Sequence, residues 1–271
     1  MNRFAVVLAA ALVSAPALAA GPVTVKGSDT MVILAQRWAE EFMKKNPANK
    51  VQVTGGGSGT GIAALINGTT QIATASRPMK DAEKAKVKEK AKVDAVEIAV
   101  AKDGVTFYVN ETNPLNALAM EDLRKIYRGD VKNWKEVGGK DAPIVLYSRE
   151  NSSGTYVFVK EHLLKNEDYA PEAQTLPGTA AVVNAVSKES NGVGYGGAAY
   201  AKGVKELKVK VGAEEIQGTE ANIRSGKYPM SRPLFFYTRG PATGETKAFI
   251  DFTLSKEGQQ TVTKVGYFGI D

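Results

Sequence analysis

The stretch Ser148-Arg149-Glu150-Asn151-Ser152-Ser153-Gly154-Thr155 separates two segments of different periodicity. The apolar run 144–147 predicts a strand, and residues 156–164 carry apolar side chains at helical spacing. The first N–H groups of a helix have no partner within it, and the helix dipole adds partial positive charge at that end. Such a turn suits an anion, which Arg149 could hold through a forked pair of hydrogen bonds. The stretch therefore predicts an anion site at a strand-to-helix turn.

The turn Gly27-Ser28-Asp29-Thr30 has the same character, because it follows a short strand and precedes a helix predicted for residues 31–45. Either Ser28 or Asp29 suits the N-cap of that helix. Capping alone would account for this turn, and so would an anion site that Ser28, Asp29 and Thr30 help to line.

A glycine-rich turn at residues 55–61, with Ser58 at its centre, separates the next predicted strand from a short helix at 62–66. Glycines allow the backbone to approach a ligand closely and to turn its N–H groups inward. The turn lacks the Gly-Lys-Ser/Thr ending of a P-loop and the glycine order of a dinucleotide fold. Ser-Gly-Thr occurs here at 58–60 and again at 153–155, each time between a strand and a helix.

A fourth turn, Ala75-Ser76-Arg77-Pro78, ends a further predicted strand, and Arg77 could point either at solvent or at the same pocket as Arg149. Strands alternate with helices along most of the chain, which predicts an α/β architecture with mostly parallel sheets. In open α/β sheets, ligands bind outside the carboxyl ends of the strands. Three polar helix starts and two arginines therefore predict one pocket for a tetrahedral oxyanion.

The composition excludes several kinds of chemistry. The chain of 271 residues has no cysteine and one histidine, His162, which lies in a predicted helix. Thiol catalysis, disulfides and cysteine- or histidine-rich metal sites are thereby excluded. The formal charge of +6 favours anions in general, but the lysines are interleaved with acids and do not form a nucleic-acid surface. We expect binding without catalysis, with no metal, no cofactor and no nucleic-acid partner.

Residues 1–19 have the pattern of a secretory signal: Arg3, an apolar run at 4–13, and Ala17-Leu18-Ala19 as a small-residue cleavage site. The apolar run is too short to span a membrane. We therefore expect export of a soluble protein, and the absence of cysteine excludes a lipid anchor on an N-terminal cysteine.

Two places are candidates for crossings between domains. The β-rich runs 93–100 and 105–109 are separated by Lys102-Asp103-Gly104, and nothing helical precedes the loop that follows the second run. Near the other end, residues 229–233 read as a rigid connector before a buried strand at 234–237. We place the boundaries so that 20–102 and 233–271 form lobe 1 and 103–232 form lobe 2.

These motifs, in this order and across nearly the whole mature chain, resemble those of the periplasmic phosphate-binding proteins of ABC phosphate uptake systems. The resemblance implies a two-lobed type II periplasmic binding protein fold with a two-strand hinge. It implies a periplasmic monomer that holds inorganic phosphate in the cleft and delivers it to an inner-membrane ABC permease. The implied ligand-binding residues are Ser28, Thr30, Ser58, Arg77, Arg149, Ser153, Gly154 and Thr155, and we add Asp29 as a candidate.

The chain departs from well-known members of this family at Arg77, where they carry an aspartate that accepts the proton of hydrogen phosphate. Asp29 is the acid that we single out within the ligand-like turns: it either takes over as proton acceptor or only caps its helix. The alternatives to phosphate transport are a binder of sulfate or another tetrahedral oxyanion, an exported sensing or adhesion protein, and an enzyme acting on phosphate esters.

Overall fold

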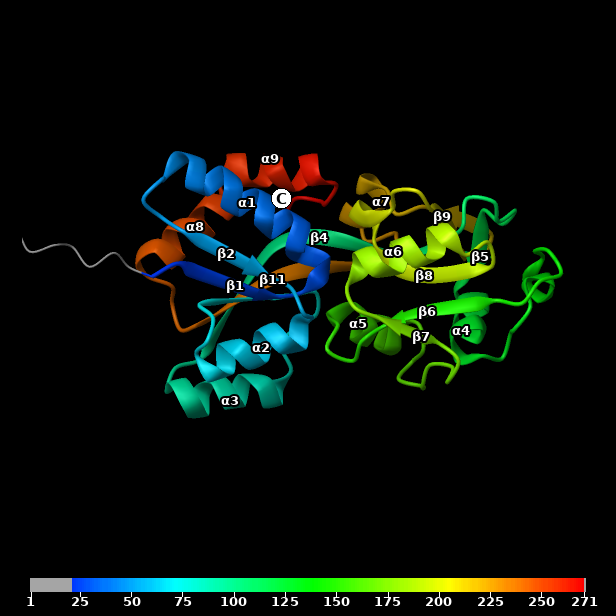
Figure 1. The fold of residues 1–271 in the computed structure, drawn as a ribbon, viewed down its shortest axis with the longest axis horizontal. Coiled ribbons are helices and arrows are strands. Elements are labelled where there is room, and N and C mark those ends of the chain that lie inside the picture. The colour runs from blue at the N-terminus through cyan, green and yellow to red at the C-terminus, as the bar shows by residue number, and fades with distance from the viewer. Residues whose placement is uncertain (1–20, 271) are drawn as a thin grey trace, which may run out of the picture.

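The computed structural model describes residues 21–270 and has two lobes side by side along its long axis (Figure 1). The signal peptide expected at residues 1–19 lies outside the described residues. Within residues 21–270, no helix combines the length and the apolar character needed to cross a membrane.

Lobe 1 is built on parallel strands, with β1 pairing with β2 on one side and with β3 on the other. Figure 1 shows α1, α8 and α9 over one face of this sheet and α2 and α3 over the other. Trp38 anchors the first layer: its ring packs edge-on against Phe236, and its Nε1 donates to the Gly258 carbonyl at 2.7 Å. The elements are β1 (Val23–Gly27), α1 (Val32–Lys45), β2 (Val51–Thr54), α2 (Ser58–Asn67), β3 (Ile72–Ala75), α3 (Asp81–Ala91), α8 (Gly244–Leu254) and α9 (Lys256–Val265).

Lobe 2 has a core of its own, formed around Trp134 and the rings of Phe107, Tyr127 and Tyr195. Its strand β6 pairs in parallel with β7 and β8, while β9 pairs in parallel with β5 and antiparallel with β10. The elements are β5 (Ala117–Ala119), α4 (Met120–Arg128), β6 (Val145–Arg149), α5 (Gly154–His162), β7 (Gln174–Leu176), α6 (Thr179–Lys188), β8 (Gly192–Gly197), β9 (Lys205–Val211), β10 (Glu214–Ile216) and α7 (Glu220–Arg224).

Two long strands run through both lobes. Strand β4 (Ala95–Val109) pairs antiparallel with β11 (Ser231–Arg239) from Ala95 to Gly104, and its second half pairs with β8 and β9 of lobe 2. The expected break at 102–104 is therefore wrong, since ladder pairing carries the strand straight through it. The expected connector at 229–233 is also wrong from Ser231 onward, because these residues already belong to β11.

The α/β, two-lobed architecture is confirmed, but the sheet is mixed. Parallel pairing holds among β1, β2 and β3 and among β6, β7 and β8. The antiparallel pairs come from the crossing strands and from the β9–β10 hairpin. A strand that passes from one lobe to the other must meet its returning partner in the opposite direction, so antiparallel pairing at the crossing follows from the two-lobed connectivity.

Helix α2 begins at Ser58, earlier than the sequence indicated, and its fourth residue, Gly61, lies against the end of β1. A Cβ built at Gly61 would lie 2.5 Å from the Gly27 Cα and closer still to the Lys26 carbonyl oxygen. Glycine at this position therefore allows α2 to approach the turn that follows β1.

We expect Gly61→Ala to destabilise the protein by about 1–3 kcal/mol, because overpacking against backbone can be relieved only by moving β1 or α2. Urea unfolding followed by circular dichroism measures the loss. Gly21→Ala is the control, since no atom lies within 4 Å of the Cβ it would add. An unchanged unfolding midpoint for Gly61→Ala would contradict this close packing.

Candidate functional site

Arg149 ends strand β6 at the point where the chain turns into α5, and its side chain is 1% exposed. Its Nη1 donates to Thr179 Oγ1 at 3.0 Å, and its Nη2 donates to Asp29 Oδ2 at 2.7 Å. The Nε is buried and has no hydrogen-bond partner among the residues that the structure describes. A buried N–H of a charged group is costly without an acceptor, so this atom marks the place where an anionic ligand would complete the site.

Asp29 comes from lobe 1 and connects three segments. Besides pairing with Arg149, its Oδ1 accepts a hydrogen bond from the Gly56 N–H at 2.7 Å. Its backbone carbonyl accepts from the Tyr200 hydroxyl of lobe 2 at 2.7 Å. The alternative that Asp29 only caps its own helix is therefore wrong. Ser28 occupies the N-cap position of the short 3-10 helix but makes no side-chain cap bond.

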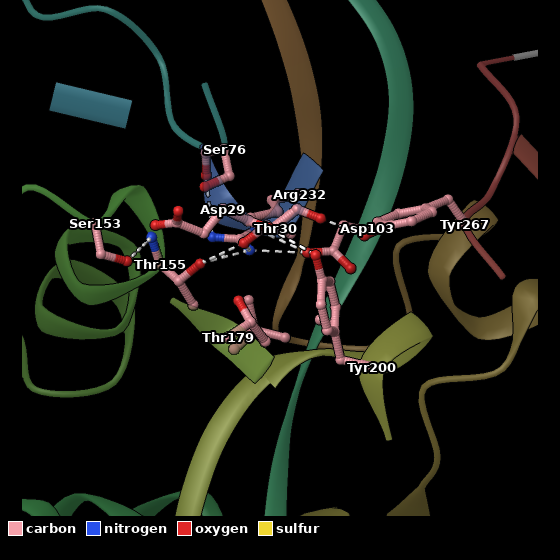
Figure 2. A network of polar contacts seen from close by, with 12 residues as sticks. Asp29, Thr30, Ser76, Asp103, Ser153, Thr155, Thr179, Tyr200, Arg232 and Tyr267 are labelled. Carbon is pink, nitrogen blue, oxygen red and sulfur yellow. Dashed lines mark hydrogen bonds and ion pairs between the residues drawn. The ribbon is translucent and has the colours of Figure 1, made fainter. Parts of the chain in front are cut away.

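The start of α5 was expected to hold an anion, and its geometry suits that role. Ser153 is the N-cap, and its Oγ accepts from the N–H groups of Thr155 and Tyr156, both at 3.2 Å. Because the oxygen accepts these bonds, its own proton remains available to a ligand. Thr155 Oγ1 lies 2.9 Å from Thr30 Oγ1 of lobe 1, and Figure 2 shows these two hydroxyls close together.

Gly154, one of the predicted site residues, lies where lobe 2 packs closely against lobe 1. A Cβ there would lie 2.6 Å from Ser76 Oγ and would overlap Ser58 Oγ. The two serines are themselves in contact, because the Ser76 N–H donates to Ser58 Oγ at 3.1 Å. Nearby, the Gly59 N–H donates to the Ser152 carbonyl at 2.9 Å. The three serine-bearing turns, distant in sequence, are thus brought together.

Arg77 does not join this cluster, which corrects the expectation of two arginines, Arg77 and Arg149, in one clamp. Its Nη1 and Nη2 each donate to a carboxylate oxygen of Glu83 at 2.8 Å, and Nη1 also donates to the Pro78 carbonyl. Glu83 lies in the first turn of α3, where it also accepts from the Lys80 N–H at 2.8 Å. Glu83, six residues further along the chain, holds the guanidinium in a bidentate pair. Within the described residues, the Arg77 Nε is buried without a hydrogen-bond partner.

The second arginine of the cluster is Arg232, which sequence analysis missed together with Asp103. These two residues lie directly opposite each other on β11 and β4. Arg232 donates to Asp103 Oδ2 from Nε at 3.1 Å and from Nη2 at 2.8 Å, and the side chains are 2% and 1% exposed. The sequence signal that could have found them is one acid and one base at the two predicted crossings: Asp103 lies in the segment 102–104, and Arg232 lies in the segment 229–233.

Arg232 extends from the crossing strands to both lobes. Its Nη2 lies 3.0 Å from Thr155 Oγ1 and 3.4 Å from Thr30 Oγ1, and its Nη1 donates to the Ser76 carbonyl at 3.1 Å. Figure 2 shows Arg232, Asp103, Thr30 and Thr155 converging. Burial raises the pKa of Asp103, and the adjacent Arg232 opposes that rise.

The cluster contains two arginines, Arg149 and Arg232, and two aspartates, Asp29 and Asp103, so their formal charges balance. Within the described residues, the donors that remain unused include the Arg149 Nε and the hydroxyl proton of Ser153. Such an arrangement can bind a small oxyanion through many directed hydrogen bonds, with the helix dipole adding to them.

The ion pair of Arg77 with Glu83 gives a pH prediction. Burial of Glu83 raises its pKa, but hydrogen bonds and the charge of Arg77 outweigh that effect and lower the pKa below the usual 4.5. A lowered pKa in the folded state stabilises the protein above pH 4.5, and this contribution is lost as the pH falls through the lower folded value.

We therefore expect Glu83→Gln to lower the free energy of unfolding by about 2 kcal/mol at neutral pH and to flatten its decline below about pH 5. Urea unfolding at a series of pH values measures both. Glu89→Gln, an exposed change on the same helix, is the control. Equal behaviour of the two variants would show that the pair contributes nothing.

Comparison with known proteins shows the family of the chain. Residues 12–257 match the model of the PBP superfamily domain. The phosphate-binding protein PstS of Pseudomonas aeruginosa is 35% identical over 260 residues, with 89% of this chain and 80% of that protein covered. The PstS of Bacillus subtilis is 33% identical, with 93% and 82% covered.

Among solved structures, the chain is similar to a putative phosphate ABC transporter substrate-binding protein with bound phosphate from Clostridium perfringens. The TM-score is 0.85 at 31% identity, and the match covers 93% of this chain and 100% of that one. The chain therefore belongs to the PBP superfamily and, within it, to the family of the PstS phosphate-binding proteins.

Proposed function

We propose that the protein binds inorganic phosphate between its two lobes and delivers it to an ABC permease for import. The observation that carries this proposal is the convergence of polar groups from both lobes around the buried Arg149, which contacts Asp29 of lobe 1 and whose Nε has no partner within the described residues. The relatives support it, since two are named as phosphate-binding proteins and one structure contains bound phosphate. The chain is accordingly a binding protein and not an enzyme.

We assign the ligand contacts to groups that the fold brings together and that retain a free donor. Arg77 is left out, because its guanidinium pairs with Glu83 at the start of α3 within lobe 1, whereas that of Arg149 pairs with Asp29 of the opposite lobe. Asp29 is kept as the acceptor for a ligand proton. The proposed phosphate-binding residues are Ser28, Asp29, Thr30, Ser58, Arg149, Ser153, Gly154 and Thr155.

The proposal includes closure of the lobes about β4 and β11, with the boundaries near residues 102–103 and 232–233. Contacts from both lobes to one anion would favour the closed state over the open one. We further propose that the chain acts in the periplasm as a monomer after removal of residues 1–19.

We expect isothermal titration to show tight binding of phosphate by the purified protein and a loss of at least about a hundredfold in Arg149→Gln, because a charged hydrogen-bond donor of the site is removed. Arg37→Gln, on the exposed face of α1, is the control and should bind as the wild type does. Binding of sulfate but not phosphate by the wild type would overturn the assignment, as would full affinity in Arg149→Gln.

Asp29 gives a separate prediction about selectivity. Each of its carboxylate oxygens makes one hydrogen bond, to Gly56 N or to Arg149, and retains a lone pair for the proton of hydrogen phosphate. Sulfate carries no such proton and cannot donate to the lone pair that remains.

Asp29→Asn should therefore narrow the preference for phosphate over sulfate by about tenfold or more, as measured by titration with both anions. Asp81→Asn, at the exposed start of α3, is the control. An unchanged preference would leave Asp29 only the role of holding Arg149.

A further inference from the structure

Strand β8 contributes one large polar side chain, Tyr195, which is fully buried and whose hydroxyl lies beside the end of β6. The two strands pair in parallel at Val145 and Leu146 of β6. Further along β6, the Tyr195 hydroxyl oxygen accepts from the Arg149 N–H at 3.3 Å and lies 2.9 Å from Ser148 Oγ. A side chain of β8 thus supplies an acceptor to β6 beyond the residues where the two backbones pair.

A second tyrosine, Tyr169, carries the connection on to α5. The Tyr195 hydroxyl donates to Tyr169 Oη at 3.1 Å, and the Tyr169 hydroxyl donates to the Tyr156 carbonyl at 2.9 Å. Tyr156 lies in the first turn of α5, where its N–H donates to Ser153 Oγ at 3.2 Å. The two hydroxyls therefore connect the end of β6 with the start of α5, which are the two ends of the turn 149–156.

Hydrogen-bond accounting fixes the direction of this connection. A backbone carbonyl only accepts, so the single proton of the Tyr169 hydroxyl goes to Tyr156. The single proton of Tyr195 then goes to Tyr169. The Tyr195 oxygen accepts in its two other contacts, from the Arg149 N–H and from the Ser148 hydroxyl. Burial raises the pKa of Tyr195 to about 12 and that of Tyr169 well above its usual 10, so both hydroxyls keep their protons at neutral pH.

A third tyrosine shows that packing alone does not require such bonds. The ring of Tyr127 lies 5.4 Å from that of Tyr195 and 6.2 Å from that of Tyr169, so it belongs to the same aromatic cluster. Its hydroxyl is buried and has no hydrogen-bond partner within residues 21–270. The core of lobe 2 thus accommodates a tyrosine whose hydroxyl makes no bond, whereas the hydroxyls of its two neighbours are directed to the ends of one turn.

We propose that Tyr195 is a positioning residue for the phosphate site and acts together with Tyr169. The two hydroxyls hold the turn 149–156 at both ends, so that the side chains of Arg149 and Ser153 are oriented before the anion arrives. This inference rests on the proposed function. A binding site must hold its contact groups within about 0.5 Å of their bound positions, and a turn that is ordered in advance loses little conformational entropy on binding. Both tyrosines act through the turn and not by contact with the anion.

The test measures phosphate affinity by isothermal titration in Tyr195→Phe, which keeps the ring and removes the hydroxyl. We expect the affinity to fall about tenfold, because the turn loses the acceptor of the Arg149 N–H. Tyr169→Phe breaks the same connection at its second link, at a residue that is only partly buried, and should also weaken binding. The proposal therefore remains testable if Tyr195→Phe does not fold.

A double-mutant cycle with Ser153→Ala separates positioning from a general loss of stability, because only residues that act through one another give losses that do not add. Tyr195→Phe should cost less affinity in the Ser153→Ala background than in the wild type, since the hydroxyl that it orients is already absent there. Equal losses in the two backgrounds would overturn the inference.

Tyr127→Phe is the matched control, because it removes a buried hydroxyl from the same aromatic cluster without removing a hydrogen bond that the structure contains. It should keep the wild-type affinity. Wild-type affinity in folded Tyr195→Phe and Tyr169→Phe would contradict the proposal, as would an equal loss in Tyr127→Phe. If the wild type itself does not bind phosphate, the proposed function fails instead, so the two failures are distinguishable.

Discussion

The antiparallel ladder between β4 and β11 is the constraint on which the rest of the structure depends. Both lobes share this ladder. Strand β11 pairs with β3 of lobe 1, and the second half of β4 pairs with β8 and β9 of lobe 2. Asp103 and Arg232 lie opposite each other where the lobes meet. The turns that carry the polar cluster are positioned relative to this ladder, so their mutual distances are set by two strands and not by flexible loops.

The cluster combines balanced charge with an excess of donors. Two aspartates offset the two arginines, and the remaining capacity lies in N–H and O–H groups that both lobes contribute. An anion bound there would be recognised chiefly by the number and direction of hydrogen bonds, since net positive charge attracts all anions alike while a fixed set of donors discriminates among them. The carboxylates also keep each guanidinium in one orientation before a ligand arrives.

Local features could be predicted from the sequence. The turn at Ser153 was identified because capping and the strand-to-helix transition depend on neighbouring residues, and the Ser28 and Ser58 turns followed by the same reasoning. Arg77 was assigned wrongly because its position after a strand suited a ligand, whereas its orientation is decided by Glu83 on the next helix. That competition between partners depends on side-chain geometry, which the sequence pattern does not contain.

Arg232 and Asp103 were missed for a different reason. A charged Lys-Asp-Gly sequence within apolar residues resembles a loop, and only a partner 129 positions away in the chain makes it a buried strand. Likewise, Pro233 suggested a connector, because proline has no N–H to donate to a neighbouring strand. Pro233 nevertheless takes a position in the β4–β11 ladder, opposite Lys102. Sequence periodicity reports on local structure, and these residues owe their placement to a long-range pairing.

With the proposed boundaries, lobe 2 is a single insertion into lobe 1, and this has a consequence for recombination within the family. Lys102 and Pro233 are Cα partners in the ladder, so the inserted segment leaves and re-enters the host lobe at adjacent points. A chimaera that exchanges lobe 2 between two relatives needs only two junctions, and both lie at paired positions of the antiparallel β4–β11 ladder. The residues that lobe 2 contributes to the polar cluster can thereby be exchanged as a unit while those of lobe 1 remain unchanged.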